Sequence, residues 1–169
     1  DLAVYLAATM ETHLRERIER AALTRAEVEA GSLPGARETA VCFADLAADV
    51  AEPPVRLVKT IGDAAMLVCP EPEPLVDAAF ALRERSRQAG LPVLRIGVAL
   101  GPALERLGDW YGRTVNLASR LTAAAPVDSI VASPEVASRL DEAFTAEELG
   151  TVRLKGLAEP IRICRLHRA

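Results

Sequence analysis

The sequence predicts an α+β fold in which helices pack against one sheet. Segments with strand periodicity alternate with segments of helical periodicity, and short turns typical of antiparallel hairpins join two pairs of strands. Of the 169 residues, 50% are hydrophobic, which is enough to build a core for one domain.

Residues 1–30 are predicted to form one helix. Apolar residues recur there at spacings of three and four, and the glycine- and proline-containing segment 31–35 ends the pattern. The apolar stripe of such a helix needs a partner, either in its own domain or in a second copy that it joins or signals to. We therefore divide the chain into a linker or transducer helix at 1–35 and one domain at 36–169.

The predicted strands of this domain are short apolar runs bounded by turn residues. They span residues 38–46, 55–60, 64–69, 93–100, 129–132, 144–149, 152–154 and 161–166. Gly62-Asp63 is predicted to turn one hairpin, and Gly101-Pro102 and Gly108 to bracket a second. Apolar residues on one face predict helices at 74–89, 114–125 and 134–141.

Composition excludes several classes of protein. A net charge of -4 argues against a nucleic-acid partner, and no apolar run reaches the length of about 18 residues that a membrane span needs. Cys42, Cys69 and Cys164 are widely spaced, which predicts free thiols in a reducing, cytoplasmic compartment. Because the chain opens on Asp1 rather than methionine, we expect a fragment of a longer protein.

Two carboxylates fall at the ends of neighbouring predicted strands. Asp45 ends the first strand and Asp63 lies in the turn of the next hairpin. Taken singly, each is better explained as a strand-end or turn residue. Together they form the kind of hard oxygen pair that suits Mg²⁺ or Mn²⁺.

A second set of polar residues follows the first. Asn116 and Arg120 are four residues apart on a predicted helix and so share a face, and Asp109 precedes that helix. Only two of the 20 basic residues are lysines, Lys59 and Lys155. The sequence has no glycine-rich phosphate loop, so metals and cationic side chains would hold the phosphates of a nucleotide.

Four motifs in order resemble the class III adenylyl and guanylyl cyclase catalytic domain, and in particular a bacterial, actinobacterial-type adenylyl cyclase. They are Phe43-Ala44-Asp45-Leu46, the run from Lys59 to Ala64, the run from Gly108 to Arg120, and Leu154-Lys155-Gly156. The resemblance covers residues 38–169. It implies a ferredoxin-like βαββαβ-type sandwich with an N-terminal helix, and a regulatory region upstream in the full-length protein.

The resemblance also implies a reaction and a role for each residue. ATP would be converted to 3′,5′-cyclic AMP and pyrophosphate in a head-to-tail homodimer with two Mg²⁺ or Mn²⁺ ions per site. Asp45 and Asp63 would bind the metals, and Lys59 and Asp109 would read the purine. Asn116 would orient the ribose, Arg120 would stabilise the pentavalent phosphorus, and Lys155 would contact the triphosphate.

The chain departs from this pattern after Leu46. The family continues with a turn and a helix, and roughly 25 residues are missing where a parallel crossover should need about a dozen or more. Either the segment is disordered and absent from the sequence as printed, or it is deleted and the domain is impaired.

Other functions remain open at this point. The main one is a catalytically silent, cyclase-like regulatory or nucleotide-binding module, which the missing segment favours and the full set of site residues opposes. A guanylyl cyclase would accept GTP. An RNA-binding domain would need exposed aromatic residues, but the chain has only six aromatic side chains.

Overall fold

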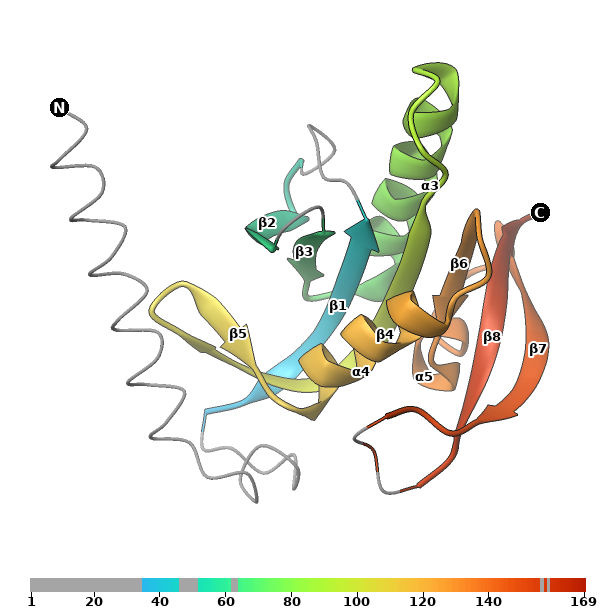
Figure 1. The fold of residues 1–169 in the computed structure, drawn as a ribbon. Coiled ribbons are helices and arrows are strands. Elements are labelled where there is room, and N and C mark those ends of the chain that lie inside the picture. The colour runs from blue at the N-terminus through green and yellow to red at the C-terminus, as the bar shows by residue number, and fades with distance from the viewer. Residues whose placement is uncertain (1–34, 46–51, 62–63, 156, 158) are drawn as a thin grey trace, which may run out of the picture.

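The computed structural model describes residues 35–45, 52–61, 64–155, 157 and 159–169, and Figure 1 shows a mixed sheet with helices on both faces. The elements are β1 (Arg37–Asp45), β2 (Arg56–Ile61), β3 (Ala64–Cys69), α3 (Pro72–Gln88), β4 (Arg95–Arg106), β5 (Asp109–Tyr111), α4 (Arg113–Ala124), β6 (Ser129–Ala132), α5 (Pro134–Ala137), β7 (Phe144–Val152) and β8 (Ile161–Arg168). The helix predicted over residues 1–30 lies outside the described residues. None of the described helices is long and apolar enough to cross a membrane.

The strand order of the sheet is β2-β3-β1-β4-β6-β8-β7, and β5 pairs with β4 beside this path. Only β4 and β6 are parallel among the described pairs; the others are antiparallel. Ile61 lies opposite Ala64, which confirms the predicted hairpin between β2 and β3. The α+β class is therefore confirmed.

Both faces of the central strand β1 are buried. Its alternate residues point to opposite sides: Ala40 and Cys42 join a cluster with α3 and α5, whereas Val41 and Phe43 join a cluster with α4. This explains the apolar run at residues 40–44 of β1. Burial raises the pKa of the Cys42 thiol to about 12, which agrees with the predicted free, buried thiol, although Cys164 is only half-buried.

Two predicted strand boundaries are wrong. β4 continues through Gly101-Pro102 and turns only at Leu107 and Gly108. It can do so because β6 pairs with β4 only as far as Val98, and a proline is tolerated on a free edge. The two strands predicted at 144–149 and 152–154 are one strand, β7, with a bulge that contains Gly150 at a φ of 89°.

The connection between β1 and β2 is shorter than a typical crossover. Both strands are antiparallel to β3, which lies between them, so β1 and β2 run parallel to each other. Residues 46–51 of the connection between them lie outside the described residues. The expectation that a segment is missing after Leu46 therefore stays a prediction. The Leu46–Ala47 junction itself lies outside the described residues.

Helix α4 lies directly on β4 because two positions of the strand lack a side chain. A Cβ atom added to Gly97 would lie 2.3 Å from the Thr122 backbone nitrogen, and one added to Gly101 would lie 2.8 Å from Thr114 Oγ1. Thr114 Oγ1 donates a hydrogen bond to the Pro102 carbonyl (2.8 Å), and Thr122 Oγ1 donates one to the Phe43 carbonyl (3.0 Å). Both ends of α4 are thus fixed to the sheet.

We expect Gly97→Ala to be far more destabilising than Gly101→Ala. The first substitution meets the backbone of α4 and must displace the helix, which typically costs about 1–3 kcal/mol or more. The second meets only the Thr114 side chain, which can change its rotamer without moving the backbone of α4. Urea unfolding of both variants measures the difference, and equal stabilities would contradict the close contact at Gly97.

Candidate functional site

The structure brings together two predicted site residues that are 50 positions apart. Lys59 on β2 donates a hydrogen bond from Nζ to Oδ2 of Asp109 at the start of β5, and the two form an ion pair. The other oxygen, Oδ1, accepts the Trp110 backbone N–H at 2.8 Å. Asp109 is only 4% exposed, so its charge needs these partners.

A bulge in β2 sets the direction of Lys59. Arg56 lies opposite Val68 and Lys59 opposite Met66, with the irregularity between Leu57 and Lys59. Val68 and Met66 belong to the cluster beneath α4, so Arg56 and Lys59 face that side of the sheet together. In a regular strand, residues three positions apart would point to opposite faces.

Helix α4 presents the next pair of predicted residues. Its buried residues are Thr114, Ala118, Leu121 and Thr122, whereas Asn116 and Arg120 are exposed one turn apart on the opposite face. Within the described part of the chain, neither of these two side chains has a hydrogen bond or an ion pair. Both are therefore available to a ligand or to a second protein surface.

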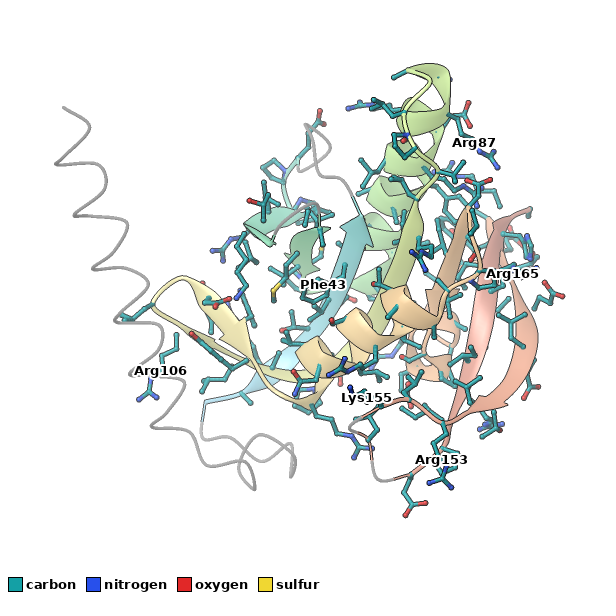
Figure 2. All side chains as sticks on the ribbon, viewed as in Figure 1. Phe43, Arg87, Arg106, Arg153, Lys155 and Arg165 are labelled. Atoms are coloured by element: carbon teal, nitrogen blue, oxygen red, sulfur yellow. The ribbon has the colours of Figure 1, made fainter. Side chains whose placement is uncertain are left out.

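Lys155 lies in a turn between β7 and β8, and Figure 2 labels it on the segment that leads into β8. Leu154 is buried and Leu157 is partly buried in the cluster that also contains Ala118 and Leu121 of α4. The Leu157 N–H donates to the Leu154 carbonyl at 3.2 Å. The turn is thus anchored on the same side of the sheet as α4, with Lys155 exposed.

The predicted metal ligands are described only in part. Asp45 is the last residue of β1 and lies opposite Ala64, the residue that follows Asp63. Asp63 itself lies outside the described residues, so its approach to Asp45 stays a prediction. Among the residues that are described, no three His, Cys, Asp or Glu side chains form a metal-binding group.

A cavity of about 640 Å³ lies beside the start of α4, lined by residues that include Arg113, Thr114, Leu117 and Arg139. None of the predicted site residues lines it. The described site residues are thus spread over one face of the domain and do not enclose this cavity.

Sequence reasoning missed three residues beside the Lys59–Asp109 pair. Glu105 accepts hydrogen bonds from Arg37 (2.7 Å) and from both terminal nitrogens of Arg56 (3.2 Å each). No periodicity could have grouped Arg56 with Lys59, because the bulge that aligns them is set by the register with β3.

Comparison with known proteins agrees with this geometry. The family model described as "Adenylate and Guanylate cyclase catalytic domain" matches residues 37–166. A pH-sensitive adenylate cyclase of Mycobacterium tuberculosis is 37% identical over 92% of this chain and 47% of its own length. An adenylate cyclase of Streptomyces coelicolor is 40% identical over 82% of this chain and 31% of its own length. The chain thus spans about half or less of these relatives.

The first of these alignments extends over 187 residues, more than the 169 of this chain. The relative therefore has residues without a counterpart here. Among solved structures, the catalytic core of a rhodopsin-guanylyl cyclase with converted specificity, in complex with ATPαS, has a TM-score of 0.66 at 23% identity. That match covers 79% of this chain and 98% of the other, and it shows the fold.

We expect Lys59→Met to destabilise the domain, because the buried Asp109 carboxylate then loses its cation. The cost of leaving such a group unpaired is about 1–3 kcal/mol in the free energy of unfolding. Urea unfolding measures it. The double variant Lys59→Met/Asp109→Asn should recover part of the loss, since a neutral amide needs no cation; a single variant as stable as the wild type would contradict the pairing.

Proposed function

Because this chain belongs to the family of adenylate and guanylate cyclase catalytic domains, we propose that it converts ATP to 3′,5′-cyclic AMP and pyrophosphate. The observation that carries this proposal is the Lys59–Asp109 ion pair. An ammonium and a carboxylate side by side match the edge of adenine, where N1 accepts a hydrogen bond and the 6-amino group donates one.

This pair favours adenine over guanine. Lys59 would donate to N1, and Asp109 would accept from the 6-amino group. Guanine presents a donor at N1 and an acceptor at position 6, so both contacts would oppose it. By analogy with base recognition in nucleic acids, each such contact contributes about 1–3 kcal/mol of discrimination.

Residues of α4 would act on the ribose and the phosphates. The Asn116 amide would hold the ribose so that its 3′-hydroxyl faces the α-phosphorus. The Arg120 guanidinium would stabilise the charge on the phosphoryl oxygens in the transition state, an effect worth about 10³-fold or more in comparable phosphoryl transfers. Their exposure and lack of partners in the described part of the chain support these roles. Lys155 would contact the β- and γ-phosphates.

Asp45 and Asp63 would hold two Mg²⁺ or Mn²⁺ ions. Asp45 ends β1 opposite Ala64, the residue that follows Asp63 in the sequence, and carboxylate oxygens suit these ions. When bound, the ions supply activation of the hydroxyl nucleophile and charge neutralisation of the leaving pyrophosphate.

The active site would form between two copies of the chain. One copy would supply Asp45 and Asp63, and the other would supply the purine-reading lysine and aspartate together with Asn116 and Arg120. A symmetric dimer then has two sites and a monomer has none. Asn116 and Arg120 are exposed and have no side-chain partner among the described residues, which supports such an arrangement.

A silent nucleotide-binding module is the second candidate. The short β1–β2 connection favours it, because the segment lies next to Asp45. The deciding experiment measures cyclic nucleotide formation by the purified chain with Mn²⁺ and either ATP or GTP, with Asp63→Ala as the control. Cyclic AMP that disappears in the control supports the cyclase. Silence with both nucleotides supports the module.

We expect Asp45→Ala and Asn116→Ala to be inactive alone and partly active when mixed. Each mixed dimer retains one intact site, assembled from the unmodified half of each chain. The rate of cyclic AMP formation measures the recovery, and native mass spectrometry verifies that mixed dimers form. Mixed dimers without activity would refute the shared site.

A further inference from the structure

We propose that Glu105 and Arg56 are positioning residues that set the purine selectivity of the Lys59–Asp109 pair. This inference rests on the proposed function, because it concerns how the same pair reads its base. Neither residue lies in the motifs on which the resemblance to cyclases depends. The evidence is a network of contacts between β2 and the hairpin of β4 and β5.

The hairpin is not joined to β2 by backbone pairing. β5 has three residues and pairs only with β4 among the described strands, with Glu105 opposite Trp110 and Arg106 opposite Asp109. Its turn contains two left-handed residues, Leu107 at a φ of 49° and Gly108 at 78°. The position of Asp109 relative to Lys59 therefore depends on side-chain contacts.

Two cations of β2 provide those contacts. The bulge in β2 turns Arg56 and Lys59 to the same face, where Arg56 binds Glu105 and Lys59 binds Asp109. The two ion pairs connect one strand to both strands of the hairpin. Glu105 and Asp109 lie on the two antiparallel strands of one hairpin. A shift of the hairpin that breaks the Arg56–Glu105 pair would therefore also displace Asp109 from Lys59.

Arg37 of β1 completes the network. Its guanidinium donates to Glu105 Oε2 at 2.7 Å and lies 4.9 Å from the centre of the Trp110 ring. Glu105 thus links β1, β2 and β4, and Trp110 donates its backbone N–H to Asp109. A continuous set of contacts runs from Glu105 through the hairpin to the carboxylate proposed to read adenine.

The exposure of the Arg37, Arg56 and Glu105 side chains indicates that their ion pairs position the buried pair and contribute little to the stability of the fold. Arg37, Arg56 and Glu105 side chains are 62%, 57% and 30% exposed, and ion pairs at such positions contribute little to folding. Asp109, by contrast, is buried. Loss of the Glu105 charge should therefore leave the domain folded while loosening the geometry of the buried pair.

The test compares Glu105→Gln and Arg56→Gln with the wild type in the 169-residue chain. The measured quantities are the ratio of kcat/KM for ATP to that for GTP, and the ratio of the Kd values for 3′-deoxy-ATP and 3′-deoxy-GTP by calorimetry with Mn²⁺. Glu38→Gln is the matched control, since it removes a similarly exposed ion pair with Arg139 at 2.8 Å. We expect both ratios to fall by roughly two- to fivefold in the two variants, within the range that an exposed ion pair supplies, and not in the control.

A double-variant cycle tests whether Glu105 acts through the purine-reading pair. In a Lys59→Met background, Glu105→Gln should change neither ratio further, because coupled residues are not additive. Suppose that the wild type prefers ATP. If Glu105→Gln then leaves the ATP-to-GTP ratios unchanged, or lowers them equally in the wild-type and Lys59→Met backgrounds, this inference is overturned and the proposed function is not. A wild type that binds and converts neither nucleotide would overturn the proposed function, and this inference with it.

Discussion

The contact between α4 and β4 is the constraint on which the geometry of the candidate site depends. Gly97 lets the helix backbone approach the strand so closely that no side chain fits between them. Hydroxyl groups of Thr114 and Thr122 then bind carbonyls of β4 and β1. With one face of α4 fixed in this way, the opposite face, which carries Asn116 and Arg120, has a defined direction. A helix held only by apolar contacts could rotate or slide.

The sheet provides the second constraint. Both faces of its central strands are covered, so charged side chains there lie at strand ends, at bulges or beyond the covering helices. Asp45 ends β1, Lys59 follows a bulge in β2, and Asp109 starts a short strand beside the sheet. The burial that stabilises the domain therefore helps to place these residues at the margins of its core.

Periodicity was sufficient to predict most elements, since β3 spans the predicted Ala64–Cys69 and helices α3 and α4 begin within two residues of their predicted starts. It failed where pairing with a neighbouring strand decides the outcome. Pro102 continues β4 because the adjacent edge is free, and Gly150 is accommodated as a bulge inside β7. The resemblance to cyclases implied that Lys59 and Asp109 act on one base, but the contacts of Glu105 depend on the bulge in β2, which no local pattern reveals.

A buried carboxylate in the role proposed for Asp109, reading a base, faces two requirements. Before nucleotide arrives, Asp109 must be neutralised, and Lys59 and the Trp110 N–H do this. When nucleotide binds, the same groups must still have capacity for hydrogen bonds. An ammonium has three donors and a carboxylate about four acceptor positions, and the described contacts use one and two of them. In the proposed orientation adenine would therefore bind to the intact pair, which would keep the carboxylate neutralised. Guanine in the same orientation would place its N1–H against the ammonium and its 6-oxo group against the carboxylate, so both contacts would be unfavourable.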